Sequence, residues 1–356
     1  AIFAGDIPAT YLRIPGTPAS AAATLDGHEL AKQGRGGFAL MIDLFCSSIG
    51  GLIGVGLLIL IAPQLARFAL RFSNFEYFWL AIFGLSMSAV VSSGNTLRGL
   101  ISAGLGILLS TVGLDVVSGA QRFTFGNAEL MSGFGFIPVM IGLFGVSEVI
   151  RSVLNSPSTS GSAVKTIESK DSVWDALKAI WSKKLTVVKS SVAGTVIGAL
   201  PGAGADIAAW AAYGMEQRTS KDKESFGKGA IAGVVAPTSA NNAAVGGAWI
   251  PALVFGIPGD AVTAIVLGAF MMYEIKPGPL IFQQNPEQVH SIFLIALITQ
   301  FLLLPCGYIG LKTFGWILRL PRNVVMVAVL VFSVVGAYSL RNSLFDVYLV
   351  AGFGLV

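Results

Sequence analysis

The sequence has few charged residues, and histidine and cysteine are scarce. Only 12% of its 356 residues are Asp, Glu, Lys or Arg, against roughly 25% in a typical soluble domain. Two cysteines and two histidines exclude a disulfide framework and a zinc cluster. The net charge of +4 is too small for nucleic-acid binding but is normal for a membrane protein with positive cytoplasmic loops. These shortages exclude a soluble enzyme.

Long hydrophobic runs take the place of the missing charge. Hydrophobic residues make up 54% of the chain, and the mean hydropathy is +0.75. The runs cover residues 38–62, 76–92, 97–113, 134–150, 185–199, 229–270, 292–318, 324–340 and 344–356. None shows the alternating pattern of a membrane barrel. We therefore expect an all-α integral membrane protein with many helices, some of them broken.

The most polar stretch, residues 151–184, divides the chain. Its lysines and Arg151 outnumber its acidic residues, so the positive-inside rule predicts a cytoplasmic loop. Residues 1–150 and 185–356 are then two membrane regions. The chain opens at Ala1 rather than methionine and closes within an apolar run shorter than the roughly 20 residues of a bilayer span. We expect an internal fragment, truncated at both ends.

A ten-residue word occurs twice. Residues 7–16 read IPATYLRIPG and residues 250–259 read IPALVFGIPG, with six identities at an offset of 243 positions. Proline and glycine interrupt helices, and interrupted segments at matching places in two halves mark the substrate sites of transporters. We expect two related halves, arranged as an inverted repeat. The alternative is a pair of kinked structural helices.

A third break lies in residues 198–206, which read GALPGAGAD. Pro201, Gly202 and Gly204 are expected to end one helix and let the next begin near Asp206. The free N–H groups and positive dipole end of that helix would face an anion. No strand precedes the motif, so a dinucleotide-binding fold is rejected.

Two adjacent amides, Asn241 and Asn242, lie in an otherwise apolar stretch. Buried amides are costly unless they are satisfied. Their NH₂ groups could bind a carboxylate and their carbonyls a cation. Equally, they could cap the ends of helices around them.

Two acidic residues follow the breaks. Asp206 and Asp260 are candidate cation ligands or proton carriers, because ionisable residues at membrane depth are usually functional. Helix N-capping is the alternative role for each. Asp43 and Glu148 are weaker candidates, because a position near the membrane interface would explain them. No nucleophile elbow, Walker loop or metal-binding pattern occurs, so we expect no catalytic residue, metal or ATP hydrolysis.

Several long motifs in the sequence resemble those of one family. They are DIPATYLRIPGTPASAAATLDG, QRFTFG, GFIPVMIGLFGVSEV, GALPGAGADIAAW, SANNAAVGGAWIPALVFGIPGDAVTAI and KPGP. Together the motifs resemble the large membrane subunit of tripartite tricarboxylate transporters (TctA-like) along essentially the whole chain. The matching substrate-binding positions are Pro15, Gly16, Thr17, Pro201, Gly202, Gly204, Asn241, Asn242, Pro258 and Gly259.

The resemblance implies a function and partners. It implies ion-driven symport of citrate or related carboxylates across a bacterial inner membrane, without a cofactor other than Na⁺ or H⁺. The partners would be a small four-helix membrane subunit and a periplasmic solute-binding protein. Thr238 departs from the family, which often has an acid there, so ion coupling would fall to Asp206 or Asp260. A passive anion channel is the alternative function.

Overall fold

The protein was analysed as a computed structural model that describes residues 2–13, 15–91, 96–115, 120–147, 149–150, 172–317 and 322–355. These residues are overwhelmingly helical, which confirms the helical fold class. The strands among them are β1 (Gly113–Leu114) and β2 (Gln121–Arg122), an antiparallel pair with Gly113 opposite Arg122.

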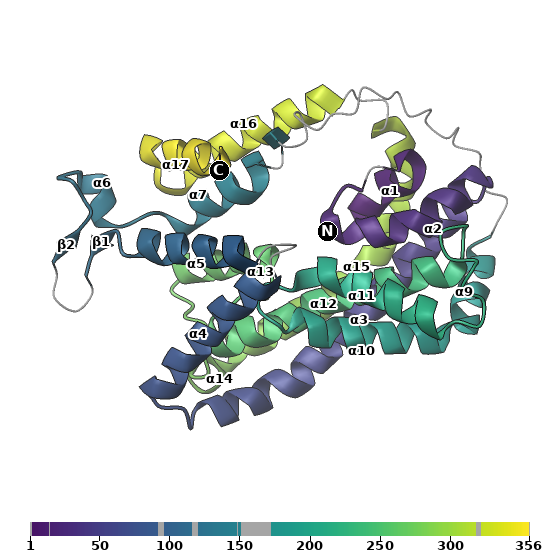
Figure 1. The fold of residues 1–356 in the computed structure, drawn as a ribbon, viewed down its shortest axis with the longest axis horizontal. Helices are drawn as coiled ribbons and strands as arrows, with labels where there is room; N and C mark the ends of the chain where they lie inside the picture. Colours follow the sequence, from purple (N-terminus) through teal and green to yellow (C-terminus); the bar gives the residue numbers. More distant parts are fainter. Residues whose placement is uncertain are drawn as a thin grey trace. The chain divides into compact units, whose positions relative to one another are not determined.

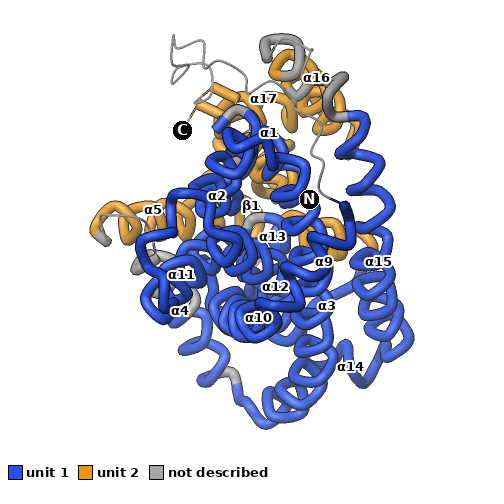
Figure 2. The backbone as a smooth tube through the Cα atoms, turned by 90° about the vertical axis from the view of Figure 1, so that its right-hand side faces the viewer, with its two compact units in different colours: residues 1–84, 160–264, 275–319 blue, residues 85–159, 265–274, 320–356 orange. Residues whose placement is uncertain are grey.

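The described chain forms two compact units, coloured separately in Figure 2. Unit 1 comprises residues 1–84, 160–264 and 275–319, and unit 2 comprises residues 85–159, 265–274 and 320–356. Both units therefore combine segments from the two membrane regions expected from the sequence, and that division of the chain stays a prediction. Most of the expected cytoplasmic loop, residues 151–171, lies outside the described residues, as does Glu148.

Unit 1 is built from long helices and short connecting ones (Figure 1). They are α1 (Ile2–Leu12), the 3₁₀ turn η1 (Pro18–Ser20), α2 (Ala21–Lys32), α3 (Gly36–Ala69), α9 (Val173–Ser182), α10 (Lys184–Gly198), α11 (Gly204–Thr219), α12 (Ile231–Phe255), α14 (Ile281–Gln284) and α15 (Pro286–Ile317). Two further helices, α4 (Asn74–Val91) and α13 (Ala261–Met272), begin in unit 1 and continue into unit 2.

Helix α12 is the centre of unit 1 and packs against α3, α10 and α11 (Figure 1). Glycines make these contacts close. A Cβ at Gly54 of α3 would lie 2.5 Å from the carbonyl oxygen of Ala243, and one at Gly198 of α10 would lie 2.1 Å from that of Ala244. Small residues spaced four apart let helix backbones approach in this way inside membranes. The sequence of α12 is thus suited to burial between other helices.

Prolines lie inside several helices without breaking them. Pro237 and Pro251 both fall within α12, and Pro63 and Pro305 fall within α3 and α15. The Thr238 hydroxyl donates to the carbonyl oxygen of Val234 at 2.8 Å, a local bond that threonine makes to the preceding turn inside a helix. Helix α12 runs without a break through residues 237–247.

Asp26 of α2 anchors the segment that leads into α12. Its Oδ1 accepts the backbone N–H groups of Gly227, Gly229 and Ala230 at 2.7–2.8 Å, and its Oδ2 accepts the Tyr213 hydroxyl at 2.9 Å. Asp26 has no exposed surface. Four hydrogen bonds compensate the burial of its charge.

Unit 2 has its own core. Its elements are α5 (Thr96–Ser110), α6 (Ala128–Met131), α7 (Phe136–Met140), the π-helical turn η2 (Ile141–Val146), α16 (Arg322–Arg341) and α17 (Leu344–Gly354). Val146, Ala337 and Val350 pack together at its centre. The buried Asp346 forms a bidentate ion pair with Arg341.

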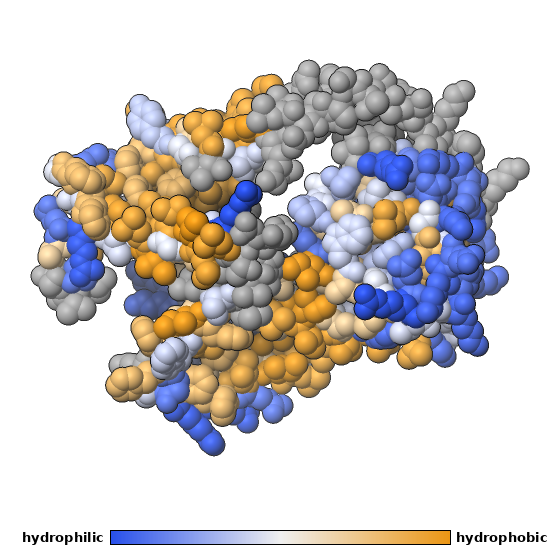
Figure 3. Space-filling model, viewed as in Figure 1, coloured by the Kyte–Doolittle hydropathy of each residue, from blue (hydrophilic) through white to orange (hydrophobic). Residues whose placement is uncertain are grey.

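Two described helices are long and apolar enough to cross a bilayer, namely α3 and residues Pro286–Thr313 of α15. Large hydrophobic side chains on both are exposed, including Leu60 at 63% and Phe301 at 59%. Figure 3 shows hydrophobic side chains covering a broad part of unit 1, with hydrophilic ones gathered at the end that carries α2 and α9. Exposed apolar surface of this extent is typical of a protein that contacts a membrane or another protein.

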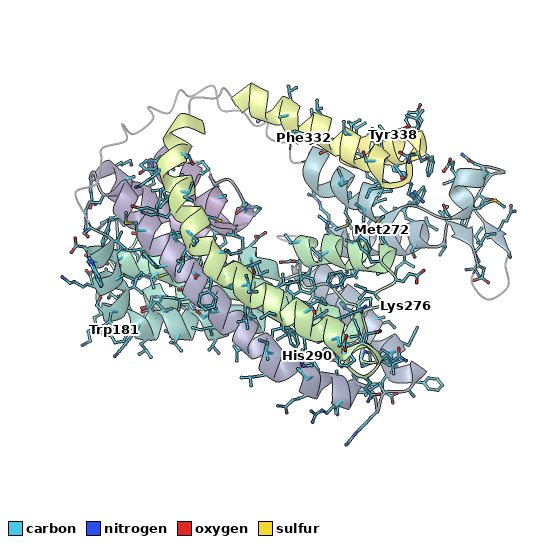
Figure 4. The ribbon with its side chains drawn as sticks, turned by 180° about the vertical axis from the view of Figure 1, so that it is seen from behind. Trp181, Met272, Lys276, His290, Phe332 and Tyr338 are labelled. Atoms are coloured by element: carbon cyan, nitrogen blue, oxygen red, sulfur yellow. The ribbon has the colours of Figure 1, made fainter. Side chains whose placement is uncertain are left out.

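Helix α9 has exposed tryptophans of the kind found at a membrane interface. Trp174 and Trp181 are 71% and 73% exposed, and the Lys184 ammonium lies 5.1 Å from the centre of the Trp181 ring. Figure 4 shows Trp181 at the outer edge of unit 1. Tryptophan and lysine are enriched where a membrane meets water.

Candidate functional site

The helices that carry the two copies of the repeated word end in the same way. The residue after α1 is Arg13, with φ of 58°, and the residue after α12 is Gly256, with φ of 71°. Their N–H groups donate to Ala9 and Ala252, each at 3.1 Å. Left-handed residues of this kind end helices. The sequence repeat is therefore also a repeat of local structure.

The chain beyond each Pro-Gly is also matched. In the first copy the hydroxyls of Thr17 and Ser20 lie 2.6 Å apart. At the equivalent positions of the second copy, the Thr263 hydroxyl donates to the Asp260 carboxylate at 2.8 Å. Asp260 also accepts the Thr263 N–H at 2.8 Å, so it caps α13. Each break thus leads directly into a new helical turn.

Both Pro-Gly corners lie against the helix that precedes them. A Cβ at Gly16 would lie 2.7 Å from the Cα of Gly5, and a Cβ at Gly259 would lie 2.7 Å from the Cα of Ala248. These pairs are again 243 positions apart. Only glycine permits such close backbone approach.

The third break meets the second. The N–H of Gly202 donates to the carbonyl oxygen of Gly259 at 3.0 Å, and a Cβ at Gly204 would lie 3.3 Å from the Asp260 Cβ. As the sequence predicts, α10 ends at Gly198 and α11 begins at Gly204. Two predicted breaks are therefore one structural feature.

The chain beyond the first break also reaches the start of α11. Ala19, two residues beyond Thr17, packs with Ala205 and Ala208 of α11 and with Ala244 of α12. The start of α11 therefore contacts residues at or next to both the first and the second break. Pro15, Gly16 and Thr17 are at least partly exposed there.

The backbone donors in this region are not equally available. The N–H of Gly16 donates to the carbonyl oxygen of Gly5 at 3.0 Å, and the N–H of Gly202 donates to the carbonyl oxygen of Gly259. In contrast, no side chain caps the start of α11. Because the first N–H groups of a helix have no partner within it, residues Gly204–Asp206 present the donors best placed for an anion.

The two amides lie in the middle of α12 rather than at helix ends. Asn242 is half-buried, and its Nδ2 donates to the carbonyl oxygen of Ser47 at 2.6 Å and to Oε1 of Gln300 at 2.9 Å. Asn241 is fully buried, with Nδ2 at 3.5 Å from the carbonyl oxygen of Ala19. Its Oδ1 has no partner among the described residues. The end-capping alternative therefore does not apply, and a ligand role stays a prediction.

Asp206 and Asp260 come together as a pair of acids. Asp206 lies in the exposed part of the first turn of α11, where its charge interacts with that of Asp260. Asp260 is half-buried and caps α13. The negative charge of Asp206 is stabilised by the positive N-terminal end of α11. Their ion-coupling role stays a prediction. No cluster of three or more potential metal ligands occurs within the described ranges.

Sequence reasoning missed Asp6 and ranked Asp43 low. Asp6 is 1% and Asp43 2% exposed, and their carboxyl groups face each other between α1 and α3. Asp6 immediately precedes the first Ile-Pro-Ala. An acid in an apolar helix next to a repeated break was the signal available.

Comparison with known proteins agrees with this architecture. The chain matches the Tripartite tricarboxylate transporter TctA family over residues 1–356. An uncharacterized 52.8 kDa protein of the TAR-I ttuC' 3' region of Agrobacterium vitis is 36% identical over 99% of this chain and 70% of its own length. A protein of the TAR-II ttuC' 3' region of the same organism is 38% identical over 46% of this chain and 67% of its own. No solved structure matches. The chain belongs to the tripartite tricarboxylate transporter TctA family, a family of membrane transporters.

Proposed function

We propose that the chain is the large permease subunit of a binding-protein-dependent system that imports tricarboxylates or related small carboxylates, driven by an ion gradient. The observation that carries the proposal is the hydrogen bond between Gly202 and Gly259, which joins two helix breaks beside a third. Broken backbone at membrane depth is tolerated only where it is buried in protein or lines a cavity. Secondary transporters use such places to bind substrates.

The substrate carboxylate binds at the start of α11. Residues Gly204–Asp206 offer uncapped N–H groups and the positive end of the helix dipole. Asn242 orients the substrate from α12. The two matched breaks around Gly16 and Gly259 let the surrounding helices move relative to this point, as an inverted repeat of two related halves would.

A cation must accompany an anionic substrate at this place. The carboxylates of Asp206 and Asp260 lie beside the proposed anion-binding turn, and like charges repel an incoming carboxylate. Na⁺ or H⁺ at either acid removes that repulsion. Substrate and ion then bind together, which makes the transport symport.

The protein works in the bacterial inner membrane as a multi-pass subunit. A small four-helix membrane subunit and a periplasmic solute-binding protein complete the system, following the organisation that the family name describes. The interfacial tryptophans of α9 fit a position at one membrane surface.

Uptake of a panel of labelled carboxylates tests the proposal. Cells carry the complete gene and its partner genes, with and without the binding protein and with and without a Na⁺ or H⁺ gradient. Accumulation that requires both is expected. Equilibration without accumulation would support the alternative, a passive anion channel, and absence of carboxylate uptake would overturn the substrate class.

A further inference from the structure

Two buried acids lie outside the three breaks. Asp6 of α1 and Asp43 of α3 are almost completely inaccessible to solvent, and each carboxyl group acts directly on the other. Two adjacent carboxylates cannot both be ionised in such surroundings unless a cation lies with them. The pair therefore requires a bound proton or another cation.

Their hydrogen bonding is incomplete in a way that suits a cation. Neither oxygen of Asp6 has a partner in the described structure, and neither does Oδ2 of Asp43. The Ser20 hydroxyl lies beside Asp6 and shares a hydrogen bond with the Thr17 hydroxyl, in which either oxygen could be the donor. The Ser47 hydroxyl donates to Oδ1 of Asp43 at 3.3 Å. Three buried acceptor atoms thus share one small region.

A further buried acceptor without a partner belongs to α12. Asn241 has no exposed surface, and its Oδ1 has no partner in the described part of the chain. Its Nδ2 contacts Ala19, the residue before Ser20. The Asn241 side chain thus lies next to η1, which also carries Ser20, and its unsatisfied amide oxygen is a second observation that favours a cation, since cations such as Na⁺ prefer oxygen ligands.

Among the described residues, no basic side chain forms an ion pair with Asp6 or Asp43. Helix α12 has no titratable residue, and those of α15 are exposed. On α2, the ring of His28 lies 2.9 Å from the carbonyl oxygen of Thr10, and Asp26 is held by its own four hydrogen bonds. On α3, the buried Cys46 thiol interacts with the Asp43 carboxylate but has no positive charge that would neutralise it.

We propose that Asp6 and Asp43 form a buried site for one monovalent cation, a proton or Na⁺, separate from Asp206 and Asp260. Asp206 is exposed and Asp260 caps a helix, whereas the Asp6–Asp43 pair has unsatisfied oxygens. The inference rests on the proposed ion-driven transport and adds a second cation site to the one proposed at Asp206 and Asp260.

The site is next to the first break. A Cβ at Gly5 would lie 2.7 Å from Oγ of Ser20 and 2.9 Å from the backbone nitrogen of Thr17. Asp6 therefore adjoins the turn that leads from Gly16 into η1. Filling or emptying the cation site changes the contacts of this turn, and that connects ion occupancy to the break.

Carbodiimide labelling tests ion binding without transport. Dicyclohexylcarbodiimide adds to a protonated carboxyl group in an apolar site, and the product rearranges to a stable N-acylurea that mass spectrometry locates. In the purified full-length protein we expect labelling of Asp6 or Asp43, decreasing as the buffer becomes more alkaline. The fully hydrogen-bonded Asp26 is the internal control and stays unlabelled.

The same labelling distinguishes the two cations. If NaCl slows the labelling relative to choline chloride, the site binds Na⁺; if the two salts act alike, it binds a proton. Either result supports the site. Labelling of neither acid at any pH would overturn the inference.

Transport by Asp6→Asn and Asp43→Asn tests coupling. In vesicles that contain the whole system, we expect gradient-driven citrate accumulation to fall by roughly 5-fold to 150-fold, the usual range for coupling between two sites, while citrate exchange between the two sides continues. Accumulation equal to the wild type by both variants would overturn the inference. If the wild type itself accumulates no carboxylate, the proposed function fails instead.

Discussion

Gly202 and Gly259 are joined by a backbone hydrogen bond of 3.0 Å. This bond connects the corner between α10 and α11 to the corner between α12 and α13. Neither glycine has a side chain to bind a substrate. Their contact instead fixes the start of α11, where uncapped N–H groups lie, against the end of the repeated word.

Gly259→Ala is expected to disrupt that contact. The new Cβ would lie 2.5 Å from the carbonyl oxygen of Gly198 and 2.7 Å from the Cα of Ala248, and backbone atoms cannot easily move away. We expect a loss of about 1–3 kcal/mol in unfolding free energy together with loss of uptake. Thermal unfolding in detergent and uptake assays measure the two effects.

Gly310→Ala is the matched control for this variant. Gly310 lies in α15, and a Cβ there would meet nothing within 4 Å. Its unfolding free energy is expected to stay the same or to rise by up to about 1 kcal/mol, because alanine is favoured over glycine inside a helix. Equal effects of the two substitutions would show that the corner is not closely packed.

Arg13→Gly is expected to stabilise the protein. Arg13 occupies the left-handed region at φ of 58°, which costs a non-glycine residue roughly 1–2 kcal/mol. The greater entropy of glycine in the unfolded chain offsets roughly 0.4–1 kcal/mol of that gain. A small rise in Tm is predicted, and a fall in Tm on Gly256→Ala. A fall in Tm for Arg13→Gly, or a rise in Tm for Gly256→Ala, would contradict the structural equivalence of the two corners.

Asp26→Asn is expected to destabilise unit 1 strongly. Three N–H groups, from Gly227, Gly229 and Ala230, lose a charged acceptor, and bonds to charged groups contribute about 1.5–3 kcal/mol each. Tyr213→Phe removes one bond only and is expected to cost about 1–2 kcal/mol. Unfolding in detergent gives the free energy of unfolding of both variants. An equally small loss in both would argue against Asp26 as the residue that anchors this segment.

Asn242→Ala is expected to reduce uptake far more than it reduces the amount of protein in the membrane. Gln300→Ala is the control, because it removes one partner of the Asn242 amide without removing the amide itself. Immunoblots of membranes and initial uptake rates give the comparison. Parallel loss of abundance and uptake in Asn242→Ala would reduce that residue to a structural link between α12, α3 and α15.

Local breaks were predictable because proline and glycine act within a few residues. The sequence alone locates the corner at Pro201–Gly204. It also identifies the ten-residue word that occurs twice, 243 positions apart, and whose two copies end their helices in the same way. Pattern alone does not reveal that Gly202 contacts Gly259, because that contact depends on how α10 and α12 pack.

The roles of buried polar residues were harder to predict. Asp260 could be a ligand or a cap, and the structure shows that it caps α13 through Thr263. Asn241 and Asn242 lie within an unbroken α12, because tight packing against α3 and α10 favours a continuous helix there. Asp6 and Asp43 are 37 positions apart in the sequence, so only the fold brings them together.

Substrate protection of single cysteines tests the location of the site most directly. In a full-length protein without its native cysteines, Thr17→Cys at the first break and Ile207→Cys at the start of α11 are labelled with a hydrophilic maleimide. Trp181→Cys, on α9 (Figure 4), is the control. We predict that citrate, or whichever carboxylate of the panel is taken up, slows labelling at Thr17→Cys and Ile207→Cys but not at Trp181→Cys. Unchanged labelling at both site positions, under conditions where uptake is active, would contradict a substrate site at the meeting point of the breaks.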